Sequence, residues 1–507
     1  AVEPDEARRR LAQLLDGSSE ARPSQADYAS AAVGAFQPRD REGEPNVILA
    51  EAGTGVGKTL GYIAPASVWA EKNEAPVWLS TYTRNLQHQI DQELDRLYPD
   101  PAVKARRVVV RKGRENYLCL LNMEEALRSV AVRRLDAIGL GLMARWAART
   151  RDGDLSGGDF PSWLIDLIGG RLTLDLSDHH GECIYSACQH YQKCYIERGV
   201  RRARRADLVI ANHALVMVQA ARGGLDGHSR PTRYVFDEGH HVFEAADSAF
   251  SAVLSGRETA ELRRWLRGAE TRGAGRARGL KRRIEDLLTV DEGVSALDDV
   301  LRGAGILPGE GWRQRIAEGG ARGAAEAFLA AVRGQVYARA TGVDGPFDIE
   351  CDISELPPEF FEAAANLADG LSRLSQPLKA LRESLLARLD DEADSLETPT
   401  RQRIESMVRS LQYRGEDVVL AWRSMLESLA TETPERFVDW FSVQRYAGRD
   451  ADVGMQRHWL DPTQPFAEVV VGGAHGVVVT SATLRDGTGN PDADWAAAEA
   501  RTGSSYL

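Results

Sequence analysis

The segment AGTGVGKT at residues 52–59 is the feature that most constrains the fold of this chain. It follows the apolar run 47–49 and opens a stretch of helical pattern, so it joins a predicted strand to a predicted helix. Glycines let successive backbone N–H groups point into one concavity, where phosphate oxygens accept hydrogen bonds near the positive end of the helix. An ordinary strand-to-helix loop is the alternative. The Lys-Thr pair at the right offset favours a nucleotide-phosphate loop.

Side-chain chemistry suggests a role for each part of this loop. Lys58 is expected to reach the β- and γ-phosphates of ATP, and Thr59 is expected to bind the magnesium ion. Ala52 departs from the strict pattern, which has glycine there, but it is also small. The loop residues predicted to bind ATP are Gly53, Thr54, Gly55, Gly57, Lys58 and Thr59.

Two adjacent carboxylates, Asp237 and Glu238, follow the apolar run 234–236. At the end of a strand, one carboxylate can hold magnesium while its neighbour orients or deprotonates the water that attacks the γ-phosphate. We assign the first task to Asp237 and the second to Glu238. An acidic pair is equally typical of a helix N-terminus, where it complements the helix dipole. Together with the Lys58 loop, the catalytic interpretation is favoured, and the predicted catalytic residues are Lys58, Asp237 and Glu238.

Short apolar or β-branched runs recur along the chain and indicate a parallel sheet covered on both faces. They lie at residues 47–49, 77–83, 108–110, 208–211, 234–236 and 477–479. An amphipathic helix is predicted at residues 85–97. Strands alternating with helices, with phosphate chemistry at the end of the first strand, predict an α/β fold with a doubly wound parallel sheet. The site is then expected in the crevice outside the strand ends.

Between Val242 and about Met455 the strand signals nearly vanish, and stretches rich in Ala, Leu, Arg and Glu predict a helical insertion. Near its end, Phe437, Trp440 and Phe441 could line a strand of nucleic acid. Their spacing suggests a helix, where aromatic residues belong more often to the core.

Length and charge limit the classes of protein that fit. A chain of 507 residues is too long for one core and predicts about three or four domains. No apolar run approaches the roughly 20 residues that cross a bilayer, and residues 1–10 have no apolar signal, so we expect a cytosolic protein that binds no membrane. With a net charge of -12, nucleic acid must be held by local basic patches. Such runs occur at residues 106–107, 111–114, 201–205 and 276–283, although most charge runs are solvated helix faces.

Four of the five cysteines form a suggestive pattern, with Cys119 followed by Cys183, Cys188 and Cys194 in one short polar segment. In a reducing compartment a shared metal explains such a cluster better than disulfides do. Tetrahedral zinc and an iron–sulfur cubane both take four thiolates, and the one-plus-three spacing favours iron–sulfur only modestly. Histidines 179, 180 and 190 could instead contribute to a zinc site, and buried thiols without a metal remain a third alternative.

Taken in order, these motifs resemble the first motor domain of a superfamily 2 helicase of the XPD-like, DinG-type branch, which has a RecA-like fold. The segments that carry the resemblance lie at residues 22–25, 53–59, 80–87, 112–119, 212–215, 237–240 and 481–483. The last of these, Ser481-Ala482-Thr483, is a weak signal alone. The resemblance assigns adenine contact to Gln25 and an ATP contact to His240.

The same resemblance implies a [4Fe–4S] cluster on Cys119, Cys183, Cys188 and Cys194, beside ATP and Mg²⁺ as cofactors. It leaves Cys351 without a counterpart. It implies translocation on single-stranded DNA with 5′-to-3′ polarity and unwinding of duplex. Residues implied to contact DNA are Thr81, Arg84, Asn85, Arg114, Ser481 and Thr483. Single-stranded and branched DNA are the expected partners, with single-strand-binding or replication and repair proteins as candidate protein partners.

The resemblance also predicts the domain organisation. Residues 1–105, 206–243 and 455–507 form the RecA-like motor domain, residues 106–205 the iron–sulfur domain, and residues 244–454 a helical Arch-like insertion. A second motor domain, which would supply an arginine finger, is expected to be absent from this sequence. Because that finger is worth about 10³–10⁵ in rate in related phosphoryl-transfer enzymes, we expect weak ATP hydrolysis from this chain alone. A non-enzymatic DNA-binding or partner-docking module, and a nuclease-linked motor, are the alternatives.

Overall fold

The computed structural model describes residues 1–15, 23–53, 55–128, 137–178, 181–221, 231–270, 278–446 and 448–507. These residues form two compact units. The first comprises Ala1–Arg114, Gln192–Phe250 and Asp461–Leu507, and the second comprises Glu115–Tyr191 and Ser251–Leu460. No described helix is both long enough and apolar enough to cross a bilayer.

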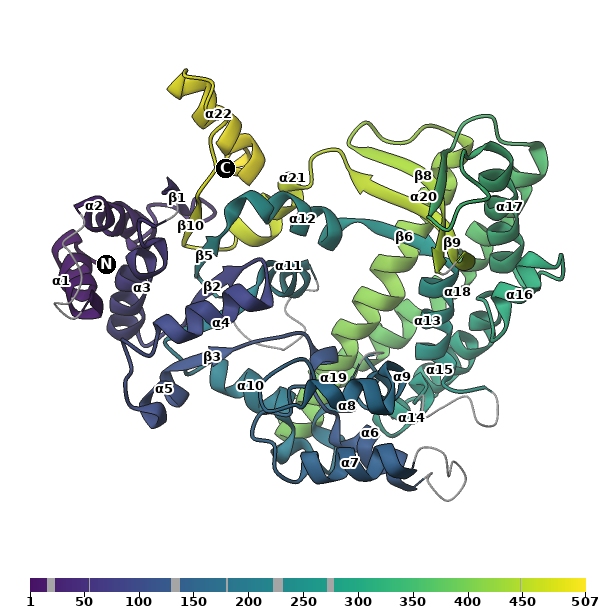
Figure 1. Cartoon of the computed structure of the whole chain (residues 1–507). Helices are drawn as coiled ribbons and strands as arrows, with labels where there is room; N and C mark the ends of the chain where they lie inside the picture. The colour runs from purple at the N-terminus through teal and green to yellow at the C-terminus, as the bar shows by residue number, and fades with distance from the viewer. Residues whose placement is uncertain are drawn as a thin grey trace. The chain divides into compact units, whose positions relative to one another are not determined.

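The first unit is built on a six-stranded parallel sheet in the order β1-β10-β5-β2-β4-β3 (Figure 1). The strands are β1 (Asn46–Glu51), β2 (Val77–Thr81), β3 (Val108–Val110), β4 (Leu208–Asn212), β5 (Arg233–Asp237) and β10 (Gly476–Ser481). All six runs predicted as strands are therefore confirmed. The helices are α1 (Pro4–Leu15), α2 (Pro23–Ala32), α3 (Lys58–Asn73), α4 (Arg84–Glu93), α5 (Pro101–Arg107), α10 (Tyr195–Ala203), α11 (His213–Ala221), α12 (Val242–Phe250), α21 (Thr463–Phe466) and α22 (Pro491–Thr502).

Successive side chains of the central strands enter two different cores. On β5, Val235 packs into the core shared with α1, α2 and α3, while Tyr234 and Phe236 pack into the core shared with α11 and α12. Strand β10 alternates in the same way, with Val478 on the first side and Val479 on the second. Because neighbouring residues of a strand point to opposite faces, a sheet covered on both faces needs continuous apolar runs. The predicted α/β class, with a parallel sheet covered by helices on both faces, is confirmed.

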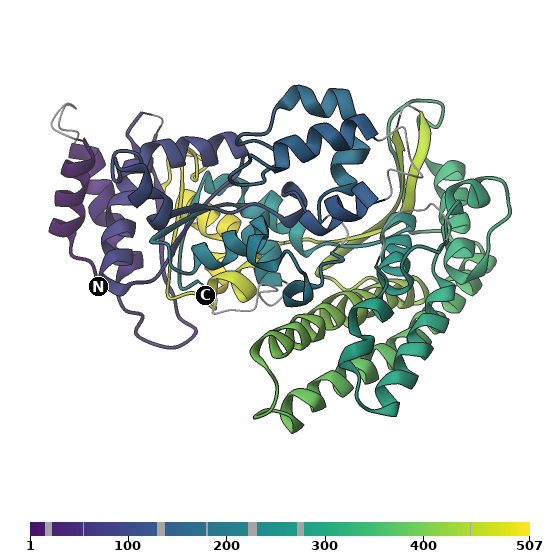
Figure 2. The ribbon, with the colours of Figure 1, turned by 90° about the horizontal axis from the view of Figure 1, so that it is seen from below.

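The second unit combines helices with a four-stranded antiparallel sheet, ordered β6-β9-β8-β7. The strands are β6 (Ala252–Ser255), β7 (Ile349–Asp352), β8 (Phe437–Tyr446) and β9 (Arg449–Trp459). The helices after residue 250 are α13 (Gly256–Arg267), α14 (Leu280–Ile284), α15 (Asp291–Gly303), α16 (Trp312–Ala317), α17 (Gly323–Arg339), α18 (Pro358–Asp391), α19 (Thr398–Ser410) and α20 (Val418–Ala430). Helix α18 packs along α15, α17 and α20, and Figure 2 shows these long helices side by side.

The helical prediction for Phe437, Trp440 and Phe441 is wrong, because all three lie on strand β8. The side chains that β8 buries deeply alternate, and they include Asp439, Phe441 and Val443. Asp439 is a charged residue in this inward row, where the Arg457 guanidinium of β9 donates to its carboxylate at 2.6 and 2.8 Å. A buried ion pair thus hides the period-two pattern that predicts a strand.

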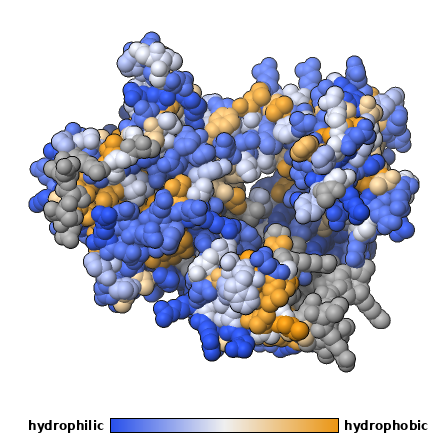
Figure 3. All heavy atoms as spheres, in the orientation of Figure 1, coloured by the Kyte–Doolittle hydropathy of each residue, from blue (hydrophilic) through white to orange (hydrophobic). Residues whose placement is uncertain are grey.

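Residues 115–191 of the second unit contain α6 (Leu120–Arg128), α7 (Ala137–Ala147), α8 (Ser162–Ile168) and α9 (Gly170–Asp175). Several large apolar side chains of these helices are exposed, among them Ile138, Trp163 and Leu167. The apolar surface in the lower middle of Figure 3 lies over this region.

Candidate active site

The glycine-rich loop lies between the end of β1 at Glu51 and the start of α3 at Lys58. Gly55 and Gly57 have φ angles of 89° and 86°, a left-handed conformation that favours glycine. Gly57 is the N-cap of α3, so the loop leads directly to the N–H groups at the start of the helix. Thr54, which the sequence assigns to ATP binding, lies outside the described residues. The other predicted loop residues lie between the end of β1 and the first turn of α3.

Gln25 of α2 is buried against this loop. Its side-chain Nε2 donates to the backbone carbonyl of Gly57 at 2.8 Å. A Cβ atom at Gly57 would lie 2.2 Å from that Nε2, so the loop and Gln25 fit closely. The structure therefore places Gln25, expected to contact adenine, at the edge of the phosphate loop.

The two glycines allow a matched test of this packing. An L-residue costs roughly 1–2 kcal/mol in the left-handed region, and this cost applies to both Gly57→Ala and Gly55→Ala. Only Gly57→Ala also displaces Gln25, because a Cβ at Gly55 meets no atom within 4 Å. Losing that hydrogen bond should add about 1 kcal/mol to the destabilisation by Gly57→Ala. Urea unfolding of both variants checks this, and equal losses would contradict the packing role of Gln25.

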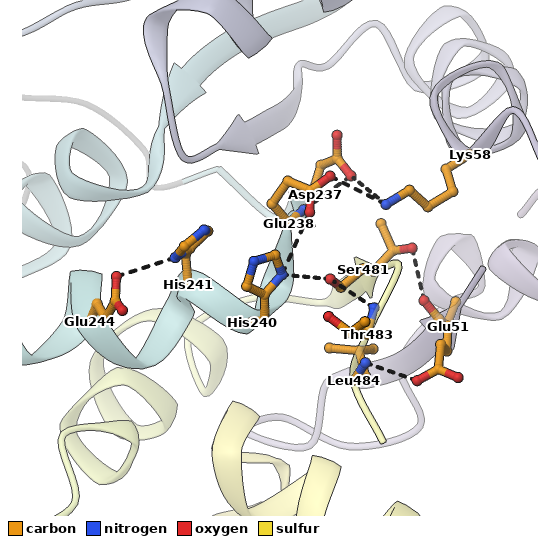
Figure 4. Close-up of polar contacts among 12 residues, drawn as sticks. Glu51, Lys58, Asp237, Glu238, His240, His241, Glu244, Ser481, Thr483 and Leu484 are labelled. Atoms are coloured by element: carbon orange, nitrogen blue, oxygen red, sulfur yellow. Dashed lines mark hydrogen bonds and ion pairs between the residues drawn. The ribbon is translucent and has the colours of Figure 1, made fainter. Parts of the chain in front are cut away.

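The acidic pair lies directly opposite Lys58. Asp237 is the last residue of β5, and the Lys58 Nζ atom lies 3.3 Å from Glu238 Oε1 and 3.9 Å from Asp237 Oδ1 (Figure 4). Glu238 has a φ of 55°, an uncommon conformation for a non-glycine residue. Such strain persists where the surroundings hold the residue in place, as they often do at functional sites. The structure thus brings together the three residues predicted to be catalytic.

Burial sets the electrostatics of Asp237. It raises the pKa of the Asp237 carboxyl, and the ammonium of Lys58 acts against this rise. The buried hydroxyl of Tyr62 donates to Asp237 Oδ2 at 3.1 Å, and burial raises the pKa of Tyr62 well above its usual value. Tyr62 therefore stays protonated as a donor and fixes one carboxylate oxygen. Tyr62 interacts with the side chains of both Asp237 and Thr59, and these two side chains offer the hard oxygen ligands that Mg²⁺ prefers.

His240 connects the acidic pair to the end of β10. Its Nδ1 atom lies 2.6 Å from Ser481 Oγ and 3.5 Å from Glu238 Oε2 (Figure 4). Burial and the neighbouring His241 lower the pKa of His240, so the ring is favoured in its neutral form. The backbone N–H of Thr483 donates to Ser481 Oγ at 3.3 Å. Ser481 and Thr483, both predicted to contact DNA, are therefore connected to the acidic pair through His240.

Glu51 anchors the segment that follows β10. Its Oε2 accepts from the backbone N–H groups of Leu484 and Arg485 at 2.9 and 2.8 Å, and its Oε1 accepts from the Arg485 guanidinium. These hydrogen bonds lower the pKa of Glu51 despite its partial burial. Glu51 is not among the site residues predicted from the sequence, although its position immediately before the glycine loop is a usable signal.

The remaining residues predicted to contact DNA lie at two places in the first unit. Thr81 is buried at the end of β2, while Arg84 and Asn85 are exposed in the first turn of α4. Thr83 caps this helix by accepting from Leu86 N at 3.3 Å. Arg114 lies beyond β3 and forms an ion pair with Glu197 of α10 at 3.6 Å.

His213, at the start of α11, is a buried residue that sequence reasoning did not single out as a site residue. Its Nδ1 lies 2.7 Å from the Ser80 hydroxyl of β2, and its ring packs at a tilt against Phe236 of β5. Complete burial lowers the pKa of His213 to about 3. The histidine is therefore neutral in the folded protein and supports the strand ends next to Asp237.

This burial makes stability depend on pH. Because the folded-state pKa lies below the unfolded value of about 6.5, unfolding takes up a proton below that pH, and the stabilisation is lost as pH falls. Wild-type protein should lose about 2 kcal/mol more of its unfolding free energy between pH 7 and pH 5 than His213→Asn does. Urea unfolding at the two pH values measures the difference. His88→Asn, at an exposed position on α4, serves as the control and should match the wild type.

The four cysteines of the predicted cluster are divided between the units. Cys119, Cys183 and Cys188 lie in the second unit, and Cys194 is the N-cap of α10 in the first. Burial raises the pKa of the Cys194 thiol. Within the described residues, no group of three or more His, Cys, Asp or Glu side chains is arranged to hold a metal ion. His190 pairs instead with Glu124 at 2.7 Å, and the other two histidines considered as zinc ligands, 179 and 180, lie outside the described residues.

A parallel sheet covered on both faces, a glycine loop with Lys58 after β1 and an acidic pair at the end of β5 form an arrangement typical of P-loop nucleotide-binding domains. The chain is related in sequence to helicases of the DinG and YoaA type, which confirms the resemblance drawn from its motifs. No protein-family model matches the chain.

Three curated relatives illustrate this similarity. The protein named 3'-5' exonuclease DinG of Bacillus subtilis is 31% identical over 202 residues, covering 39% of this chain and 20% of the relative. The ATP-dependent DNA helicase YoaA of Haemophilus influenzae is 29% identical over 225 residues, covering 42% and 33%. The ATP-dependent helicase DinG of Mycobacterium tuberculosis is 31% identical over 256 residues, covering 46% and 36%. The chain thus spans from a fifth to about a third of the length of these relatives.

Among solved structures, one named XPD_Helicase aligns with 92% of this chain and 59% of its own length, at 12% identity and a TM-score of 0.34. One named Truncated XPD aligns at 12% identity and a TM-score of 0.31, over 93% of this chain and 96% of its own length. At these TM-scores the alignments add no argument of their own.

Proposed function

We propose that this chain carries the ATP-binding motor domain of a DNA helicase of the DinG type. One observation supports the proposal most directly. The Lys58 Nζ atom lies 3.3 Å from Glu238, the residue that directly follows β5, and Glu238 in turn contacts the His240–Ser481 pair. The glycine loop after β1, the candidate base Glu238 after β5 and Ser481 at the end of β10 thus lie together. They lie at the carboxyl ends of the strands, where ligands bind in folds of this type.

The residues of this edge have complementary roles in the proposed reaction. Lys58 binds the β- and γ-phosphates, and Glu238 orients and deprotonates the attacking water. Asp237 and Thr59 would hold Mg²⁺, which when bound neutralises charge on the phosphates. Tyr62 keeps Asp237 oriented through its hydrogen bond of 3.1 Å. Gln25 and His240 complete the ATP contacts, as the resemblance implies.

We further propose that the motor translocates 5′-to-3′ on single-stranded DNA and unwinds duplex or branched DNA. Thr81, Arg84, Asn85, Arg114, Ser481 and Thr483 would contact the strand, and the exposure of Arg84 and Asn85 is compatible with this role. Binding through arginines to phosphates should weaken steeply as salt rises. The proposed domains remain residues 106–205 for the cluster and 244–454 for the Arch-like insertion.

A [4Fe–4S] cluster on Cys119, Cys183, Cys188 and Cys194 is part of the proposal through donor chemistry and family resemblance. Four thiolates are the ligand set of a cubane cluster. Among the described residues, no three of these thiols are grouped so as to hold a metal ion, and no catalytic role given above depends on the cluster. Anaerobic purification followed by an iron count and a visible spectrum tests the cluster. A colourless protein with stoichiometric Zn²⁺ would replace it with a zinc site.

ATP hydrolysis with and without single-stranded DNA tests the motor function. Magnesium-dependent hydrolysis that DNA stimulates, together with ATP-dependent strand separation, is the expected result for a protein that also carries a second motor domain. The present chain alone should hydrolyse ATP only weakly. Nucleotide and DNA binding without any hydrolysis would favour the non-enzymatic module. DNA cleavage that requires a divalent metal but no ATP would favour a nuclease.

A further inference from the structure

Tyr82, the first residue after β2, stacks on His241. The two ring centroids lie 3.7 Å apart and the ring planes differ by 11°. Glu244 of α12 joins both residues, because its Oε2 accepts from the Tyr82 hydroxyl at 3.3 Å and lies 3.2 Å from His241 Nδ1. Neither ring belongs to the predicted ATP site, and the sequence analysis gave neither residue a role.

This stack continues to the acidic pair. The ring of His241 contacts that of His240, with centroids 4.1 Å apart. His240 Nδ1 is in turn 3.5 Å from Glu238 Oε2, and Figure 4 shows His241, His240 and Glu238 following one another along the chain. An unbroken series of side-chain contacts therefore runs from Tyr82 to the proposed base.

Tyr82 also lies inside the segment proposed to contact DNA. Thr81 before it is buried, and Thr83 after it caps α4, so the backbone on both sides is held by the fold. The Tyr82 side chain is 40% exposed, which leaves it accessible beside Arg84 and Asn85. A strand bound there would change the surroundings of Tyr82 and hence the position of the His241 ring.

We propose that Tyr82 and His241 are positioning residues that couple DNA binding at the β2–α4 segment to the ATP site through His240 and Glu238. This inference rests on the proposed function. Coupling of this kind is reciprocal, so DNA should change nucleotide affinity by the same factor as nucleotide changes DNA affinity. The Tyr82–His241 stack supplies the physical contact through which the two sites would influence one another.

The test measures the affinity of a fluorescent, nonhydrolysable ATP analogue with and without saturating oligo(dT). In the wild type, DNA should change this affinity by about fivefold or more, the usual lower range of allosteric coupling. Tyr82→Leu should reduce the ratio to below about twofold while leaving the DNA-free affinity unchanged, since the Tyr82 ring and hydroxyl contact His241 and Glu244. Tyr82→Phe retains the ring and should retain most of the coupling. The double variant Tyr82→Leu/His241→Ala should lose no more of the coupling than Tyr82→Leu alone, because the two rings act as one unit.

Phe243 provides the matched control. It lies two residues after His241, is 39% exposed, and takes no part in the stack, so Phe243→Leu should leave the coupling at the wild-type value. Wild-type coupling that persists in Tyr82→Leu, or a wild type that binds both ligands independently, overturns the inference and leaves the ATP site intact. A wild type that does not bind the analogue overturns the proposed function as well.

Discussion

Lys58→Ala is expected to abolish high-affinity binding of magnesium ATP and, with it, all ATP-dependent activity. The Lys58 ammonium lies 3.3 Å from Glu238 and 3.9 Å from Asp237, so it offsets two carboxylates before any phosphate arrives. Without it, a triphosphate meets two unbalanced negative charges. One charge pair at about 4 Å contributes about 4 kcal/mol at an effective dielectric constant of 20, an upper range that corresponds to roughly a thousandfold in affinity.

Titration calorimetry with a nonhydrolysable ATP analogue measures this loss directly. We expect the dissociation constant to rise by at least about a hundredfold, allowing for partial screening of the charges. Lys72→Ala is the control, because Lys72 lies at the far end of the same helix and pairs at the surface with Glu6 at 2.8 Å. That variant should bind as the wild type does. An affinity of Lys58→Ala within threefold of the wild type would show that the loop does not hold the phosphates.

The sequence predicted the parts of the first unit whose signals are local. The central strands of the parallel sheet are buried on both faces, so their residues form continuous apolar runs such as Val477-Val478-Val479. The glycine loop is equally visible, because the left-handed conformation of Gly55 and Gly57 leaves glycine as the favoured residue. The acidic pair could be predicted because Asp237 and Glu238 directly follow the apolar run 234–236.

Features that depend on distant partners escaped prediction. Strand β8 carries Asp439 in its inward row, and only the contact with Arg457 shows why a charge can lie there. Tyr62 is one more aromatic residue on a largely buried helix until the structure places its hydroxyl on Asp237. Glu51, His213 and Tyr82 acquire their roles from segments that are far away in the sequence. Single-sequence patterns report burial and local conformation, but not which side chains meet at the ends of a parallel sheet.

Glu238→Gln is expected to separate nucleotide binding from hydrolysis. Glutamine has nearly the shape of glutamate and can accept a hydrogen bond from Lys58, but it cannot take a proton from the attacking water. General-base catalysis contributes typically about 10²–10⁴ in rate, so kcat should fall by at least about a hundredfold. Affinity for the ATP analogue should stay equal or become tighter, because one negative charge beside the phosphates is removed. Parallel measurements of steady-state hydrolysis and analogue binding distinguish this variant from Lys58→Ala, which loses both.

Glu244→Gln is the appropriate control for this substitution. Glu244 lies six residues further along, its side chain is 63% exposed, and its contacts are with His241 and Tyr82 rather than with the nucleotide loop. Hydrolysis in the absence of DNA should therefore be preserved in Glu244→Gln and lost in Glu238→Gln. If Glu238→Gln hydrolysed ATP at the wild-type rate, the base would have to be another group. Asp237 would then be the first candidate, since burial raises the pKa of its carboxyl and so makes it a better proton acceptor.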